Sequence, residues 1–216
     1  MTDEVKTSVV RSLGRYVMSK IIPLQNGYLG NGPAASTARG DLAQLRRLSA
    51  TDGNAWMTVG DLLFEGWPED ELGPLTKENK LTERTSNAVR ATLSLYAIHQ
   101  QSKESPMCLV REKGEGDWSA GSFGRACRLI EPDLEVAKGV QRRLARIEAT
   151  EDFDGALVNV RALIQLLKAK SIPLDYGRLA QDLYLIQTSE ESQRKVFRRW
   201  ASEYYAPIRT QDNEAN

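Results

Sequence analysis

The sequence has few of the residues that support catalysis, metal binding or a disulfide framework. It contains a single histidine, His99, and two cysteines, Cys108 and Cys127, neither of which belongs to a CxxC motif. Acid–base and metal chemistry need clustered His, Cys and carboxylate side chains, so we expect no metal, no cofactor and no enzyme. Two isolated thiols are typical of a cytoplasmic protein, and we expect both to be free. We expect His99 to be partly exposed near a helix end.

Long apolar runs are also missing. The best stretch, residues 9–24, is interrupted by Arg11, Arg15 and Lys20, whereas a membrane-spanning helix needs about 20 consecutive apolar residues. We therefore expect neither a membrane protein nor a secreted one. The glycine-containing segments match neither a phosphate-binding loop nor a nucleophile elbow, so nucleotide hydrolysis and serine hydrolysis are not indicated.

Net charge is absent too, because 29 Lys and Arg balance 29 Asp and Glu. The balance is uneven along the chain: residues 1–60 and 121–200 are net basic, while 61–120 and the tail are net acidic. A protein that contacts a polyanion with part of its surface has this distribution, and so do many ordinary enzymes.

Helical periodicity dominates the first half of the chain. Apolar residues recur every four positions over 7–22, and again over 82–101, which predicts two amphipathic helices. Between them, Leu42, Leu45 and Leu48 predict a short helix. The glycines and proline of 25–37 predict a mobile loop, and 53–80 is expected to be irregular with short helical turns.

The polar, aperiodic segment 101–121 is the expected boundary between two helical portions, 1–101 and 122–207. Five helices are expected in the second portion. The second of these has Val136, Val140, Leu144 and Ile147 on its inner face. Asp152 or Asp154 is expected to cap the third, the fourth is expected to begin near Asp175, and the fifth is expected to start with a cap at Ser189. No strand alternation is found, so the predicted fold class is all-α, a helical bundle.

Arginine is the most informative residue type. It outnumbers lysine and occurs in doublets on predicted helices, and its planar fork binds phosphate oxygens in a bidentate way. On the helix over 136–147, four cations form a basic ridge opposite the apolar face: Lys138, Arg142, Arg143 and Arg146. On the next helix Arg161 and Lys168 share one edge. In the last helix, Arg194, Lys195, Arg198 and Arg199 are expected outside, where Glu190 and Glu191 favour local pairing.

Five segments in order resemble a known family. They are AQLRRLS at 43–49, SFGRACRLI at 122–130, QRRLARIEATED at 141–152, VRALIQLLKAKSIPLDYGRLAQDL at 160–183 and RRWASEYYAP at 198–207. This arrangement is similar to the CasB family, the small subunit of the type I-E CRISPR surveillance complex Cascade. Basic residues at positions matching the family's motifs are Arg46, Arg47, Arg125, Arg128, Arg142, Arg143 and Arg161.

The resemblance implies an all-helical, non-enzymatic protein that lies as a pair of copies beside the large subunit and the repeated backbone subunit, with a guide RNA. It also implies contacts with the target and displaced DNA strands of the R-loop, made by basic side chains without reading sequence. The scarcity of aromatic residues in the basic segments favours contacts with the backbone over base stacking, so weak binding is expected of the isolated chain. Two alternatives are a helical scaffold that acts only through protein contacts and a stand-alone module for single-stranded nucleic acid.

Overall fold

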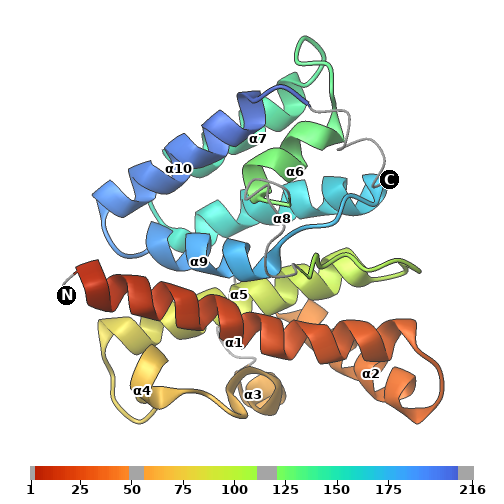
Figure 1. Cartoon of the computed structure of the whole chain (residues 1–216), viewed down its shortest axis with the longest axis vertical. Helices are drawn as coiled ribbons and strands as arrows, with labels where there is room; N and C mark the ends of the chain where they lie inside the picture. Colours follow the sequence, from red (N-terminus) through yellow and green to blue (C-terminus); the bar gives the residue numbers. More distant parts are fainter. Residues whose placement is uncertain (1–2, 49–55, 111–120, 209–216) are drawn as a thin grey trace.

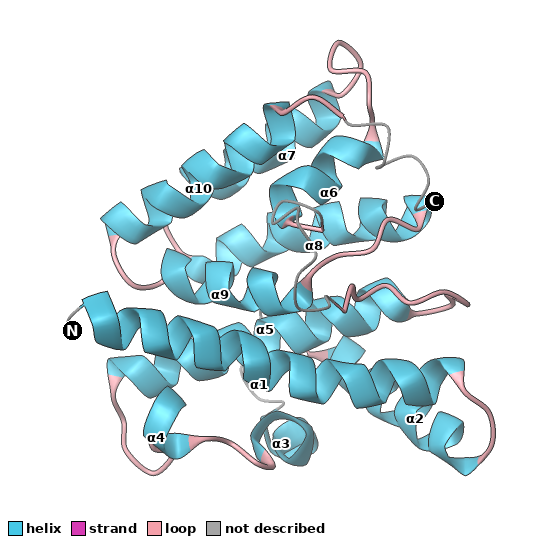
Figure 2. Ribbon diagram, in the orientation of Figure 1, coloured by secondary structure: helices cyan, strands magenta, loops and turns pink. Residues whose placement is uncertain are grey.

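The computed structural model describes residues 3–48, 56–110 and 121–208, which form ten helices (Figures 1 and 2). Within these ranges no strand is present, and the all-α prediction is confirmed. The helices are α1 (Asp3–Leu29), α2 (Pro33–Arg47), α3 (Trp56–Phe64), α4 (Glu69–Leu72), α5 (Lys80–Gln100), α6 (Phe123–Ile130), α7 (Lys138–Ala149), α8 (Phe153–Lys170), α9 (Tyr176–Ile186) and α10 (Glu190–Tyr205). None of the described helices is long and apolar enough to cross a membrane.

Polar side chains fix where several helices begin. Asp152 accepts a hydrogen bond from the Gly155 amide at 2.6 Å, so it caps α8, and Asp154 lies inside the helix. Asp175 and Ser189 cap α9 and α10 in the same way, where these helices were expected to begin. Such caps satisfy amide groups that the first turn of a helix leaves without partners.

The predicted loop at 25–37 is wrong, because α1 continues through Pro23 to Leu29. A methyl group on Gly27 would lie 2.9 Å from the Ala38 Cβ, so this glycine allows α1 and α2 to pack closely and does not break the helix. The turn is confined to residues 30–32, where Gly32 adopts a φ of 80° and Pro33 starts α2. The segment 56–80 contains the short helices α3 and α4, in line with the expected helical turns.

Helix α9 joins the two predicted portions in space. It packs against α1 and α5 on one side and α10 on the other, while α5 also packs against α8 (Figure 1). One hydrophobic cluster contains side chains from both portions, such as Leu13, Leu93, Leu163 and Leu183. The two portions therefore share a core.

Two expectations about side chains are wrong. Val136 precedes α7 and is 66% exposed, so the inner face of α7 consists of Val140 and Ile147, with Leu144 half-buried. His99 is fully buried, and its Nδ1 lies 2.9 Å from the Tyr176 hydroxyl on α9. It is therefore a core residue that connects α5 to α9.

Helices α6 and α10 touch at Gly124. A Cβ at this position would lie 2.8 Å from the Cα of Trp200 and closer still to the Trp200 carbonyl oxygen, and neither backbone atom can move aside. We expect Gly124→Ala to lower the free energy of unfolding by about 1–3 kcal/mol. Thermal or urea denaturation measures this loss.

The matched control is Gly40→Ala at an exposed position of α2, where an added Cβ meets nothing within 4 Å. This change is expected to raise stability by about 0.5–1 kcal/mol, because alanine restricts the unfolded chain more than glycine does. Equal stability of the Gly124→Ala variant and the wild type would contradict the close approach of α6 and α10.

Burial of His99 gives stability a pH dependence. Desolvation, followed by the charges of Lys103 and Lys168, lowers the pKa of His99 from 6.5 to about 3. Between these values the unfolded chain binds the proton and the folded chain does not, so this residue makes stability fall as the pH falls from 6.5. The slope approaches about 1.4 kcal/mol per pH unit.

Urea denaturation of the wild type and His99→Gln at several pH values isolates this effect. Glutamine does not titrate, so the variant is expected to lose less stability than the wild type on acidification. Burial raises the pKa of Asp182 and Glu203, which acts in the opposite direction and is common to both proteins. Parallel stability curves between pH 4 and 7 would show that His99 does not titrate as the structure requires.

Candidate nucleic-acid interface

The α7 ridge, made up of Lys138, Arg142, Arg143 and Arg146, lies on the outer side of its helix. Val140 and Ile147 bury the inner face of α7, which packs on α8. Lys138, Arg142 and Arg146 are exposed. Arg143 is half-buried and donates a hydrogen bond to the Gly139 carbonyl at 3.1 Å. None of the four forms an ion pair with a described carboxylate. The ridge is therefore a concentrated patch of positive charge.

A second basic cluster forms where α2 meets the end of α8. Burial, followed by the nearby charges of Arg46 and Lys103, lowers the pKa of Lys168. Lys168 donates a hydrogen bond to the Gln101 side chain at 3.2 Å, and Lys103 donates one to the Ser171 hydroxyl at 2.8 Å. The fold thus brings together Arg46 and Lys168, which the sequence separates widely, and Arg47 is exposed beside Arg46.

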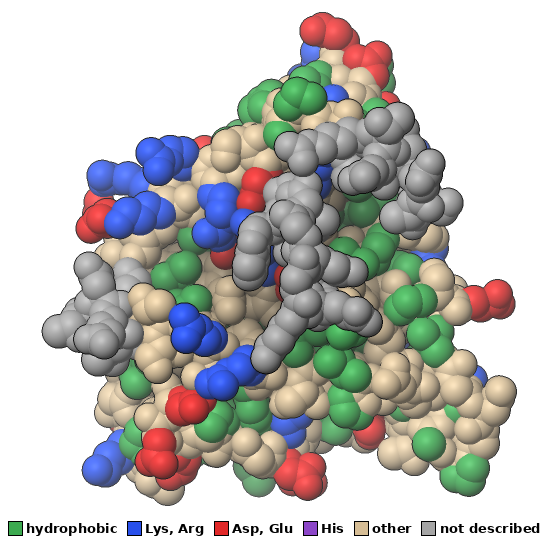
Figure 3. Space-filling model, viewed as in Figure 1, with side chains coloured by type: hydrophobic (Ala, Val, Ile, Leu, Met, Phe, Trp, Pro, Cys, Tyr) green, Lys and Arg blue, Asp and Glu red, His purple; other side chains and the backbone are tan. Residues whose placement is uncertain are grey.

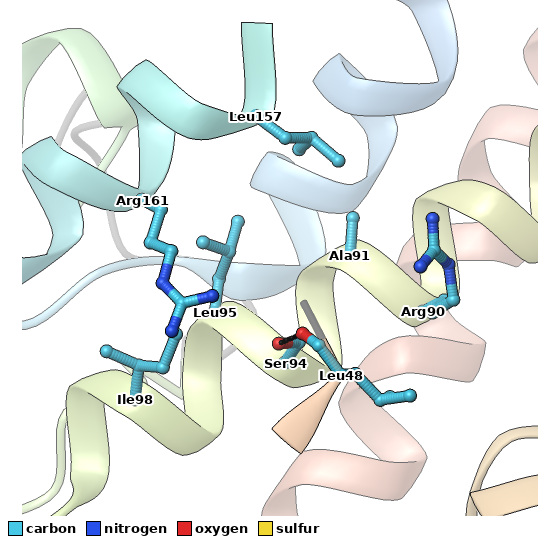
Figure 4. A pocket seen from close by; sticks show the side chains of 8 residues that line it. All are labelled: Leu48, Arg90, Ala91, Ser94, Leu95, Ile98, Leu157 and Arg161. Carbon is cyan, nitrogen blue, oxygen red and sulfur yellow. Dashed lines mark hydrogen bonds between the residues drawn. The ribbon is translucent and has the colours of Figure 1, made fainter. Parts of the chain in front are cut away.

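Arg161 lies nearer the start of α8 than Lys168 does. It is at one end of a small apolar pocket between α5 and α8 (Figure 4). Arg90 of α5 lies at the other end, and Leu157 and Ala91 separate the two (Figure 4). The guanidinium of Arg90 is 5.1 Å from the centre of the Trp56 ring and 3.9 Å from the Asp154 carboxylate, so this cation is engaged within the fold.

Arg125 and Arg128 do not lie with the other predicted residues. Both side chains are buried on α6, which packs against α10. Arg125 donates hydrogen bonds to the Ala206 and Pro207 carbonyls at 3.2 and 2.9 Å, and Arg128 donates to the carbonyls of Glu131 and Pro132. We therefore correct their assignment to the interface: they hold the segment that directly follows α10 and the α6–α7 connection.

Sequence reasoning missed a cationic groove between α1, α9 and α10. The groove has an empty volume of about 1270 Å³, and four arginines line it: Arg11, Arg15, Arg178 and Arg199. Figure 3 shows blue side chains over α1 and over α10 on this face of the molecule. The spacing of Arg11 and Arg15 was the available signal, because residues four apart share one side of a helix.

The cations of this groove are partly neutralised. Arg178 pairs with Glu203, and Arg15 lies 3.3 Å from Glu71. Arg199 is half-buried and pairs with the buried Asp182, whereas the sequence predicted only that it lies on the outside of its helix.

Trp200 also donates a hydrogen bond to Asp182 at 2.7 Å, and burial raises the pKa of this carboxyl against the effect of Arg199. These contacts connect α9 to α10. At the exposed start of α10, Arg194 and Lys195 pair with Glu190 and Glu191, which confirms the expected local pairing.

Both thiols are buried, and burial raises their pKa values. Both cysteines are free, as expected, and desolvation raises the pKa of Cys108 to about 12 and that of Cys127 well above its usual value. Among the described residues, no group of three or more His, Cys, Asp or Glu is placed to hold a metal ion.

The fold and its charged outer helices define a small all-helical protein whose distinctive feature is its cationic surface. The family model for "CRISPR-associated protein Cse2 (CRISPR_cse2)" matches residues 41–205, which is most of the chain. The chain therefore belongs to the Cse2 family of CRISPR-associated proteins, and the resemblance to CasB proteins of the type I-E Cascade complex is confirmed.

Solved structures agree with this membership. The crystal structure of CasB from Thermobifida fusca matches with a TM-score of 0.73 and 26% identity, over 90% of this chain and 98% of that chain. A CRISPR-associated protein of the Cse2 family from Thermus thermophilus matches in fold, with a TM-score of 0.57 and 22% identity, over 89% of this chain and 97% of that chain. No curated protein matches the chain by sequence.

Proposed function

We propose that this protein is a non-catalytic Cascade subunit that stabilises the R-loop through sequence-independent contacts with the target and displaced DNA strands. Family membership supports the role of a CRISPR-associated structural subunit. The observation that supports DNA contact is the α7 ridge, whose four cations have no ion-pair partners among the described carboxylates. Phosphate oxygens are suitable partners for guanidinium groups at such a surface.

The distribution of cations favours backbone contact. The α7 ridge lies on one helix, whereas the cluster of Arg46, Lys103 and Lys168 comes from α2, the turn after α5 and α8. Contacts with phosphates fix the position of a strand and carry no sequence information. Guide pairing supplies the sequence, so the protein has to hold whichever strands the guide selects.

Small contributions are sufficient for this role. Forming an R-loop exchanges one duplex for another of about equal stability, so a few phosphate contacts shift the balance. Each phosphate contact with single-stranded DNA adds about −0.7 to the slope of log affinity against log salt. In this proposal the partners are the large subunit, the repeated backbone subunit, a second copy of the chain, the guide RNA and both DNA strands.

Charge reversal on the α7 ridge tests the proposal. We expect Arg142→Glu combined with Arg143→Glu to shorten target DNA retention by the guide-loaded complex by about tenfold, since charged contacts contribute about 1 kcal/mol or more. A gel-shift chase measures retention, and co-purification with the other subunits measures assembly, which is expected to be unchanged. Adding Arg161→Glu is expected to increase the loss.

The matched control reverses Lys77 and Lys80, two exposed cations before and at the start of α5. These changes alter the net charge equally and are expected to leave retention unchanged. Wild-type retention by the ridge variant would refute the proposal. Loss of assembly with normal retention by the remaining complex would identify α7 as a protein-binding scaffold.

A further inference from the structure

A second groove lies between α7 and α10. It has an empty volume of about 530 Å³, and the described residues that line it all come from these two helices: Gln141, Leu144, Ala145, Glu148, Phe197, Trp200, Ala201, Tyr204 and Tyr205. Both helices lie in the part of the molecule farthest from α3 and α4 (Figure 1). The groove is therefore distinct from the cationic groove that α1 forms with α9 and α10.

The floor of this α7–α10 groove is aromatic. Four of its nine lining residues are Phe, Trp or Tyr, all on one side of α10. The rings of Phe197 and Trp200 lie 5.7 Å apart, and those of Tyr204 and Tyr205 lie 5.1 Å apart at 88°. Tyr205 is 59% exposed, which is unusual for a large aromatic side chain and leaves its ring available for stacking.

Cations border the groove on both helices. On α7, Lys138 and Arg142 lie three residues before Gln141 and Ala145 of the lining, and both are exposed. On α10, the exposed Arg194 and Arg198 lie three residues before Phe197 and Ala201 of the lining. Residues three apart are neighbours on a helix, so each rim carries two positive charges beside the lining. The lining also contains one exposed carboxylate, Glu148, which the four rim cations outnumber. The exposed pair of Arg194 with Glu190 is weak and opens readily.

We propose that the α7–α10 groove binds single-stranded nucleic acid, with a base stacked against the exposed ring of Tyr205, which the buried Phe197, Trp200 and Tyr204 support from the same helix. The inference rests on the proposed function and adds a base-dependent contact to it. Flat apolar bases joined by a chain of negative charges match an aromatic floor between two cationic rims. Stacking tolerates any base, so the groove adds affinity without reading sequence. It also gives α10 a role beyond packing.

Abasic DNA separates stacking from phosphate binding. Fluorescence anisotropy of the purified full chain at low salt compares a short thymidine strand with an abasic strand of equal length. The two strands have the same phosphates, and the thymidine strand is expected to bind about tenfold more tightly, as stacking of a base on an aromatic ring predicts.

Two variants locate the effect in the groove. Ala201 is exposed on α10, so Ala201→Leu fills the groove without entering the core, and Tyr205→Ala removes the exposed ring. Both are expected to remove most of the preference for the thymidine strand while leaving binding of the abasic strand unchanged. The matched control is Ala169→Leu at an exposed position of α8, which is expected to retain the full preference.

The other outcomes distinguish this inference from the proposed function. Both strands could bind equally while Arg142→Glu with Arg143→Glu still shortens target DNA retention by the complex. This result would overturn the base-binding groove and leave the proposed phosphate contacts standing. No binding of either strand at low salt would overturn the groove. The Ala201→Leu variant could instead keep the wild-type preference for the thymidine strand and fail to join the complex. This result would overturn the base-binding groove and show that another subunit occupies the site.

Discussion

The enclosure of α5 and α9 is the constraint on which the rest of the structure depends. Every residue from 88 to 100 on α5 is buried, and α9 is covered by α1 and α5 on one side and α10 on the other. Charged groups on such enclosed helices need partners, because a buried charge without one is costly. Arg90 of α5 lies beside Asp154, and Asp182 of α9 pairs with Arg199. Most of the cations therefore lie on the outer helices, and α7 carries four of them without an ion-pair partner among the described carboxylates.

Buried polar contacts fix how α5 and α9 meet each other and how α10 attaches to them. Asp182 of α9 accepts hydrogen bonds from Arg199 and Trp200 of α10, and His99 of α5 meets Tyr176 of α9. Breaking one member of such a group leaves a buried polar atom without its partner, so these contacts specify one arrangement. The position of α10 in turn defines both the cationic groove beside α1 and the aromatic groove beside α7.

The amphipathic helices were predictable because their apolar spacing reflects burial directly, and the starts of α8, α9 and α10 near Asp152, Asp175 and Ser189 were visible in the sequence. The continuation of α1 past Gly27 was not predictable, because only the nearby Ala38 of α2 shows that this glycine allows close packing of the two helices. The α7 ridge followed from a helical wheel. Burial of Arg125 and Arg128 could not be predicted in this way, because their carbonyl partners come from the segment after α10 and from the α6–α7 connection. The aromatic groove depends on α10 lying beside α7, which no local pattern encodes.

The central claim is that α7 faces a nucleic-acid backbone inside the assembled complex. An experimental structure of the guide-loaded complex with an open R-loop tests this most directly. The account predicts phosphate oxygens within hydrogen-bonding distance, about 3 Å, of the Arg142 or Arg143 guanidinium. Carboxylates of a neighbouring subunit in that position, with both DNA strands held elsewhere, would contradict it.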